Sequence, residues 1–188
     1  MKKIKLLLLC SLLSFAPAFA QKNKEAFIIP NLPLDSATLL YTYTDVVELP
    51  GVLKDELYKR AFSWANIFYK NPTDVIREKN PDEGMLLIKA RIRISNEPDK
   101  KGVITQAGDV MYTLTLNFKD GKYRYEVTKI NWQQVSYYPI ERWKDTTSSS
   151  FKPVYSYYLL ETDKSINAVI ADFRKKIAEP VKVKSSDW

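Results

Sequence analysis

"YTLTLNFKDGKYRYEVTKINW", residues 112–132, decides the fold, because apolar and polar residues alternate on both sides of a central Asp-Gly pair. Asp-Gly between two alternating runs is the sequence signal of a two-residue β-hairpin loop. The loop fixes the register of the two predicted strands. The predicted pairs are Lys119 with Lys122, Phe118 with Tyr123, Leu116 with Tyr125 and Leu114 with Val127.

The same alternation separates the aromatic side chains from the cations. Successive residues of a strand point to opposite faces of the sheet, so the apolar residues share one face and Arg124 lies on the other. A base-stacking platform for nucleic acid needs aromatic rings exposed beside cations on one face. We therefore expect a half-buried sheet and no nucleic-acid partner. The predicted core face carries Tyr112, Leu114, Leu116, Phe118, Tyr123, Tyr125 and Val127.

The apolar parity changes after Val127, because Ile130 and Trp132 fall on the other set. A β-bulge or a second layer over the other face of the sheet would explain the change. Two Tyr-rich segments, residues 137–138 and 154–160, could supply that layer or could form a binding surface. Both interpretations stay open. The candidate aromatic surface consists of Tyr137, Tyr138, Tyr157 and Tyr158.

Other segments predict two helices and further strands. Residues 39–50 and 85–95 are predicted strands, and a short strand is predicted from Asp74 onward. A helix is predicted after Leu53, ending before Asn71-Pro72, and a second helix over residues 163–178. The first apolar stripe comprises Leu57, Ala61, Trp64, Ala65 and Phe68, and the second comprises Ile166, Val169, Ile170, Phe173 and Ile177.

The first twenty residues predict export. They combine a basic start, an apolar run and the small-x-small ending Ala18-Phe19-Ala20, which is typical of a cleaved signal peptide. An uncleaved anchor is disfavoured because the apolar run is short for a membrane span. Lipid attachment at Cys10 is disfavoured because Leu9 precedes it inside that run. We expect a mature chain from Gln21 without a transmembrane span, in the periplasm, at the cell surface or secreted.

Removal of the signal changes the chemistry that is available. Twenty of 188 residues leave, so 168 remain, and 26 basic against 22 acidic residues give +4 instead of +7. The single Cys leaves with the signal, and the sequence contains no His. Catalysis through a Ser-His or Cys-His pair and zinc sites of thiolate or imidazole are therefore excluded. We expect no catalytic residues, no metal site and no cofactor.

Four cations define a second candidate surface. Lys89, Arg91 and Arg93 alternate along the predicted strand 85–95, and Arg124 lies on the polar face of the hairpin. A solvated sheet face accounts for such charges, and a footprint for phosphate or acidic glycan is the functional alternative. These residues are the candidate partner-binding face.

Two stretches of the chain resemble a known family. "YTDVVELPGVLKDELYKRAFSWANIFYKNPTDVI" (residues 43–76) and "YTLTLNFKDGKYRYEVTKI" (residues 112–130) resemble a domain of unknown function from secreted bacterial proteins, with a TATA-box-binding-protein-like (TBP-like) fold. Relatives often have a small polar residue at the helix start, where this chain has Leu53. The resemblance implies an α+β fold, in which an N-terminal and a C-terminal helix pack on one face of a curved antiparallel sheet. It carries no site residues.

This resemblance and the patterns divide the chain into four parts. We expect a signal peptide (1–20), an extended arm (21–37), the TBP-like domain (38–132) and a C-terminal extension with the terminal helix in the same globular unit (133–188).

Three function classes fit these observations. The leading one is a non-enzymatic envelope module that binds a protein, a glycan or a small apolar ligand. Its cleft is expected between the first helix and the sheet, or under the Tyr-rich segment. The alternative is a hydrolase of polysaccharide or peptidoglycan with two convergent carboxylates about 5–9.5 Å apart; local acidic pairs occur at Asp55-Glu56 and Asp82-Glu83. A structural subunit would show an unpaired strand edge or an exposed apolar patch.

Overall fold

The computed structural model describes residues 28–134 and 136–180. The predicted signal peptide, with Cys10, and the first part of the predicted arm lie outside the described residues. Residues 28–33 have no regular structure, and Leu34 forms an isolated antiparallel bridge with Tyr41.

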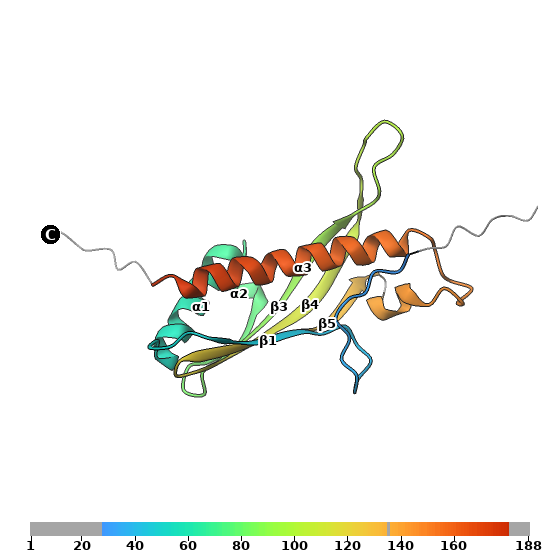
Figure 1. Cartoon of the computed structure of the whole chain (residues 1–188). Helices are drawn as coiled ribbons and strands as arrows, with labels where there is room; N and C mark the ends of the chain where they lie inside the picture. The colour runs from blue at the N-terminus through green and yellow to red at the C-terminus, as the bar shows by residue number, and fades with distance from the viewer. Residues whose placement is uncertain (1–27, 135, 181–188) are drawn as a thin grey trace, which may run out of the picture.

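Within these residues, one six-stranded antiparallel sheet has the order β1-β5-β4-β3-β2, and β6 pairs with the end of β5 (Figure 1). The strands are β1 (Tyr43–Glu48), β2 (Ile76–Asn80), β3 (Met85–Ser95), β4 (Gln106–Lys119), β5 (Lys122–Gln133) and β6 (Tyr137–Pro139). The helices are α1 (Lys54–Phe68), α2 (Pro72–Val75), the 3-10 helix η1 (Ile140–Lys144) and α3 (Tyr155–Ala178). The predicted α+β class is confirmed.

The β4–β5 hairpin has the predicted register. Lys119 pairs with Lys122 and Phe118 with Tyr123 across the Asp-Gly loop, and the two pairs predicted further along the strands are also present. Gly121 adopts φ +75°, a conformation that costs glycine little and other residues more. All seven residues of the predicted core face are buried. The aromatics of this hairpin are therefore core.

A bulge explains the change of parity in β5. Thr113 pairs with Thr128, but Met111 pairs with Asn131, so β5 has one extra residue opposite β4. Lys129 lies in this bulge with φ +53°. The extra residue returns Trp132 to the core face, so no second covering layer is needed to account for it.

α1 begins without a side-chain cap of its own. Leu53 occupies the N-cap position, and its side chain accepts no hydrogen bond. The carboxylate of Asp120, from the β4–β5 loop, accepts a hydrogen bond of 2.7 Å from the backbone N–H of Lys54. The hairpin loop therefore satisfies one of the free amides of the helix start.

α3 begins earlier than predicted, at Tyr155 instead of Asp163. The segment "VYSYYLL" is rich in residues that favour strands, and we expected short strands or extended pieces there. Tyr155, Tyr158, Leu159 and Thr162 are nevertheless buried, and their spacing is that of one helix face. Asp74 and Val75, predicted to start a strand, belong instead to the single turn α2.

Both long helices pack on the same face of the sheet. Phe118 and Tyr123 are cross-strand neighbours on that face. The ring of Phe118 contacts Tyr58 of α1 at 6.0 Å, and the ring of Tyr123 contacts Phe173 of α3 at 5.3 Å. The core thus lies between the sheet and the helix layer, and α3 crosses the sheet along its length (Figure 1).

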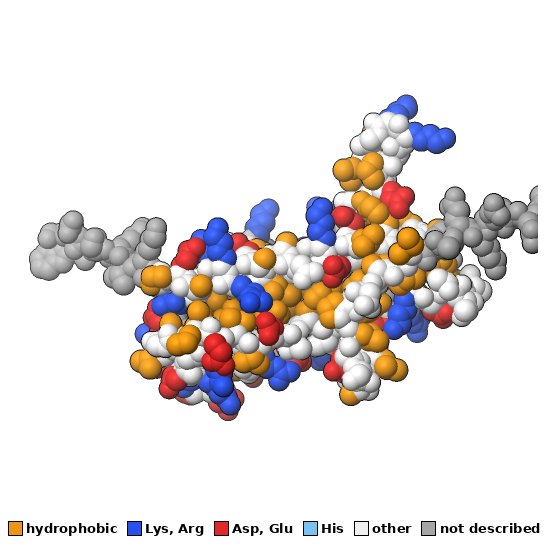
Figure 2. All heavy atoms as spheres, viewed as in Figure 1, with side chains coloured by type: hydrophobic (Ala, Val, Ile, Leu, Met, Phe, Trp, Pro, Cys, Tyr) orange, Lys and Arg blue, Asp and Glu red, His pale blue; other side chains and the backbone are white. Residues whose placement is uncertain are grey.

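The β3–β4 connection projects from this body. Residues 96–105 form a loop beyond the ends of the two strands (Figure 1). Figure 2 shows cationic side chains at its tip and hydrophobic ones below. The carboxylate of Asp99 accepts hydrogen bonds from the backbone N–H groups of Lys101 and Val103, at 2.8 and 2.9 Å. These bonds give the loop a defined turn.

Candidate functional site

Three of the four candidate cations form a row on β3. Lys89, Arg91 and Arg93 are exposed on the sheet face opposite the helices. Arg91 Nη1 and Arg93 Nε each lie 3.4 Å from the carboxylate of Asp109 in β4. Arg91 and Arg93 therefore share one carboxylate, and the row of three cations keeps an excess of positive charge.

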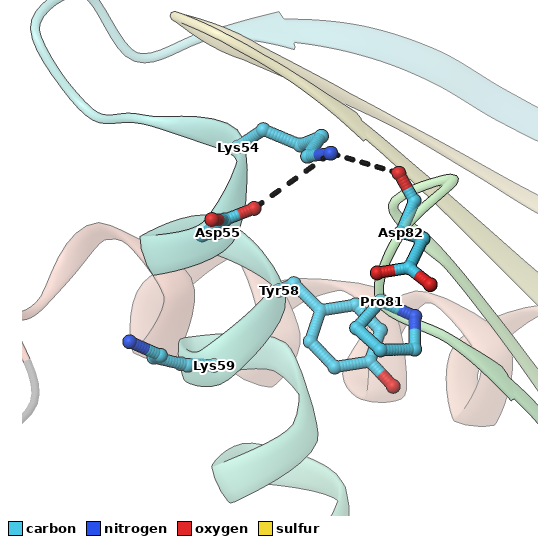
Figure 3. Close-up of a pocket in the computed structure, with 6 residues that line it drawn as sticks. All are labelled: Lys54, Asp55, Tyr58, Lys59, Pro81 and Asp82. Atoms are coloured by element: carbon cyan, nitrogen blue, oxygen red, sulfur yellow. Dashed lines mark hydrogen bonds and ion pairs between the residues drawn. The ribbon is translucent and has the colours of Figure 1, made fainter.

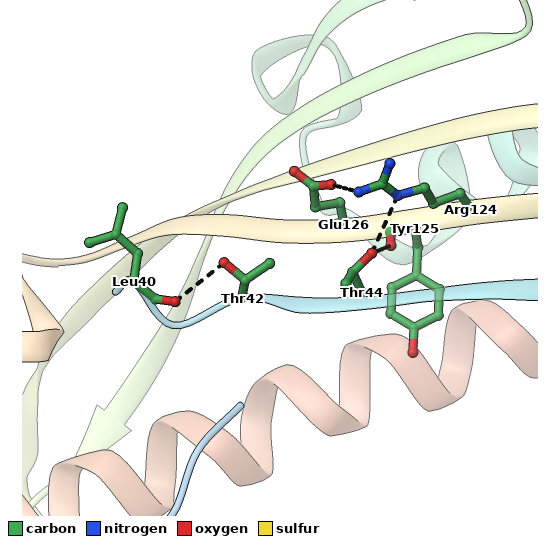
Figure 4. A network of polar contacts seen from close by, with 6 residues as sticks. All are labelled: Leu40, Thr42, Thr44, Arg124, Tyr125 and Glu126. Carbon is green, nitrogen blue, oxygen red and sulfur yellow. Dashed lines mark hydrogen bonds and ion pairs between the residues drawn. The ribbon is translucent and has the colours of Figure 1, made fainter. Parts of the chain in front are cut away.

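Arg124 does not join this row. It lies on β5, two strand spacings from β3, which corresponds to about 10 Å. Its guanidinium pairs with Glu126, and its Nε donates to Thr44 Oγ1 at 3.4 Å (Figure 4). Thr44 Oγ1 in turn donates to the backbone carbonyl of Tyr125 at 3.0 Å. Arg124 thus belongs to a separate network that joins β1 and β5.

The four candidate tyrosines also separate. Tyr137 on β6 is exposed at 71%, whereas Tyr138 and Tyr157 are half-buried. Tyr158 is buried, and its hydroxyl donates to Asn96 Oδ1 at 2.5 Å. Burial raises the pKa of the Tyr158 phenol, which keeps it a neutral donor. Because α3 starts at Tyr155, Tyr158 turns into the core, so the four residues form no common exposed surface.

Side chains fill both places where a cleft was expected. Between α1 and the sheet, Leu57, Ala61 and Ala65 have no exposed area. At the Tyr-rich segment, the Trp143 ring lies 5.5 Å from Trp132 and is also packed against the tyrosines of α3. Two hollows lie elsewhere in the described structure.

A hollow of about 400 Å³ lies where the start of α1 meets the β2–β3 turn (Figure 3). Lys54 Nζ donates to the backbone carbonyl of Asp82 at 2.8 Å and lies 3.7 Å from the Asp55 carboxylate. One member of each acidic pair from the sequence, Asp55 and Asp82, therefore lines this hollow together with Tyr58 and Pro81. The Asp55 side chain is 75% exposed, so the site is open to water.

A wider groove of about 970 Å³ runs between the C-terminal parts of α1 and α3. Trp64 forms part of its floor, and its indole N–H donates to the Asp172 carboxylate at 2.7 Å. Arg60 lies at the rim, where it is held by Glu56 at 2.9 Å and by the backbone carbonyl of Ile177 at 3.1 Å. These contacts tie the two helices together and fix the polar groups around an apolar floor.

Two apolar side chains of α1 stand in this groove and face solvent. Ile67 is exposed at 82%, and Phe68 is exposed at 39%. Phe68 was predicted as a core residue, and that prediction was wrong. The helix ends at Phe68, and the next residue, Tyr69, takes the buried position. The Phe68 ring packs 5.0 Å from Trp64 and extends the apolar floor outward.

Sequence reasoning missed this groove. Ile67 lies beside the predicted stripe of α1, and a single aliphatic residue outside a stripe carries no functional signal. The groove also needs the end of α3, more than a hundred residues later, and the hydrogen bond between Trp64 and Asp172 that joins the helices.

In residues 28–134 and 136–180, no group of three or more His, Cys, Asp or Glu side chains could hold a metal ion. Of the helices in the same residues, none combines the length and the hydropathy that a membrane crossing needs.

Comparison with known proteins agrees with this architecture. Residues 43–133 match the model of the family described as "Domain of unknown function (DUF4468) with TBP-like fold". The resemblance to this family is confirmed. The part matched to DUF4468 runs from the start of β1 to the end of β5 and leaves η1 and α3 outside.

Two solved structures resemble the chain. A DUF4468 family protein from Bacteroides ovatus ATCC 8483 is 14% identical, with a TM-score of 0.63 over 84% of this chain and 96% of that one. A TBP-like protein from Parabacteroides distasonis ATCC 8503 is 16% identical, with a TM-score of 0.55 over 74% and 94% of the two chains. At these identities the likeness concerns the fold alone. Among curated proteins, none matches the sequence.

Proposed function

We propose that this protein is a non-enzymatic binding module exported to the bacterial envelope, and that the groove between α1 and α3 is its binding site. The observation that carries the proposal is the exposure of Ile67, at 82%, beside Phe68 and above the Trp64 floor. Large aliphatic and aromatic side chains that line one hollow cost free energy while they face water. A bound apolar group removes that cost.

The rim of the groove suits a segment of another protein. Arg60 and Lys176 supply positive charge, and Asp172 and Glu179 supply negative charge around the apolar floor. An apolar centre with a polar rim is the usual anatomy of a protein-binding surface. We therefore assign as the partner an envelope protein that inserts an apolar side chain into the groove. A small apolar ligand is the alternative occupant of the groove.

Export is supported by the sequence alone. Residues 1–20 have the basic start, apolar run and Ala18-Phe19-Ala20 ending of a signal peptide. The solved relatives named above come from bacteria.

The absence of catalysis is supported by the inventory of side chains. The sequence has no His, and its single Cys is Cys10 in the predicted signal. Asp55 and Asp82 line the hollow beside α1, where the ammonium group of Lys54 contacts the Asp55 carboxylate and the backbone carbonyl of Asp82. A binding role therefore requires no pair of convergent catalytic carboxylates, whereas the hydrolase alternative does.

Photo-crosslinking in the native host tests the proposal. A benzophenone amino acid in place of Ile67 should yield a covalent adduct with one envelope protein upon irradiation. The matched control is the same amino acid in place of Leu160, which is also apolar, exposed (52%) and on a helix but does not line the groove.

The proposal requires that the adduct form at position 67 and not at position 160. No specific adduct at position 67, or the same adducts at both positions, would contradict it. An adduct with a second copy of this chain would assign the groove to self-association and would also contradict it.

A further inference from the structure

One long strand of the sheet has a neighbour on only one side for much of its length. β3 pairs with β4 from Met85 to Ser95, but β2 pairs with β3 only from Met85 to Ile88. In the described part of the chain, no strand pairs with residues 89–95 on the β2 side. An edge of this kind presents backbone N–H and C=O groups that can pair with another strand.

The two sides of this edge have different chemistry. On the face opposite the helices it carries the cationic row Lys89, Arg91 and Arg93, and the Asp109 carboxylate pairs with the two arginines. On the helix face it carries Ala90, Ile92 and Ile94. Ala90 and Ile94 are buried, whereas Ile92 is half-buried and leaves apolar surface beside the open edge.

We propose that residues 89–95 of β3 bind an extended acidic peptide of a partner protein as an added β-strand. Acidic side chains at alternate positions of the peptide lie next to Lys89, Arg91 and Arg93. The apolar residues between them lie next to Ile92, on the side of the helix layer. Backbone hydrogen bonds provide affinity and the alternating side chains provide selectivity, as in other cases of strand addition.

The charges of the edge decide between an acidic partner and a second copy of this chain. Two copies paired through this edge would place two cationic rows side by side, and like charges on neighbouring strands destabilise a sheet. Cations on an open edge guard against such self-pairing. The same cations attract a strand of opposite charge. This site is separate from the groove between α1 and α3, and the proposal does not depend on it.

Synthetic peptides test the inference on the unmodified protein. A peptide of about eight alternating Glu and Val residues is long enough to pair with Lys89–Ser95. In nuclear magnetic resonance titrations it should shift and protect the backbone amides of Lys89, Arg91 and Arg93, because alternate residues of β3 bond to β4 and these three point to the open side. It should bind at least tenfold more tightly than the same peptide with Lys in place of Glu, and the difference should shrink with added salt.

N-methylation of the peptide distinguishes strand addition from simple charge attraction. Every second amide of a strand points to a given neighbour. Methylation of one alternate set should therefore abolish binding, while methylation of the other set should leave it. Equal effects of the two sets, equal binding of the Glu and Lys peptides, amide shifts confined to other parts of the protein, or no binding at millimolar peptide would each overturn the proposal. This test is independent of the crosslinking test of the groove, because the absence of adducts at position 67 would leave the peptide-binding result unaffected.

Discussion

At the scale of the residue, Gly108 shows how closely the sheet is packed at the end next to the β3–β4 loop. It pairs with Ile94 where the β3–β4 register shifts by one residue, and it adopts φ +145°. A Cβ atom at this position would lie 2.6 Å from Nε1 of Trp132. Trp132 returns to the core face only because of the bulge in β5. Gly108 and the bulge therefore both allow Trp132 to occupy its position on the core face.

Gly108→Ala should lower the free energy of unfolding by about 2–4 kcal/mol, from overpacking of about 1–3 kcal/mol together with backbone strain. Gly121→Ala is the matched control, because it also has positive φ but no atom lies within 4 Å of its Cβ position. Chemical denaturation of both variants measures the difference. Equal losses for the two variants would show that the contact with Trp132 carries no cost.

A second residue-scale feature is the buried hydroxyl pair of Tyr69 and Tyr112, 3.0 Å apart. Burial raises the pKa of Tyr112 to about 12 and raises the pKa of Tyr69 as well. In the unfolded chain a tyrosine titrates near pH 10. Between pH 10 and 12 the unfolded state therefore releases protons that the folded state retains, and stability falls as pH rises through this window.

From pH 9 to pH 11, Tyr112 alone should contribute a loss of about 1.4 kcal/mol in the free energy of unfolding. Tyr112→Phe should reduce the measured decline by about that amount, although it also lowers stability at neutral pH by leaving the Tyr69 hydroxyl without its partner. Tyr137→Phe, at a residue 71% exposed, should leave the decline unchanged. Denaturant unfolding at both pH values gives the result, and an unchanged decline in Tyr112→Phe would contradict the assignment.

Residue-level predictability depended on local regularity. The hairpin register followed from Asp120-Gly121 because loop length and alternation fix every pair between the two strands. Phe68 was misplaced and Tyr158 was left open between core and surface, because each lies near the end of a helix. One residue more or less of helix there turns a side chain by about 100°.

At the scale of the element, the start of α1 depends on another element. Leu53 at the N-cap is 66% exposed and provides no side-chain hydrogen bond, and the Asp120 carboxylate reaches the Lys54 amide instead. The apolar stripe predicted α1 well because its period runs unbroken. The start of α3 was not predictable in the same way, because tyrosine spacing that suits a helix face occurred in residues that favour strands.

Leu53→Ser should raise the free energy of unfolding by about 0.5–1 kcal/mol. The introduced hydroxyl can accept a hydrogen bond from a free amide of the first turn, and a serine at the N-cap, three residues before Glu56, would complete a capping box. Leu53→Ala is the control because it removes the same apolar surface without adding an acceptor. Thermal or chemical unfolding should rank the serine variant above the alanine variant, and equal stability of the two would contradict the expected cap.

At the scale of the whole molecule, the fold positions two separate surfaces. The helix layer creates the groove where α1 and α3 converge, and the short β2 leaves residues 89–95 of β3 without a strand on one side in the described part of the chain. The sequence predicted the layers, since apolar faces of sheet and helices must meet. The cations of β3 were predicted as a candidate binding face, but the groove and the open strand edge were not, because one depends on the approach of two distant helices and the other on the length of β2 relative to β3.

Native mass spectrometry of the mature protein, purified gently from the envelope of its own host, tests whether the groove between α1 and α3 binds a partner. The wild-type protein should carry a stoichiometric bound partner that is lost in Ile67→Glu and retained in Leu160→Glu. A wild-type protein without any bound mass, or a partner that persists in Ile67→Glu, would contradict the assignment of the groove as the binding site.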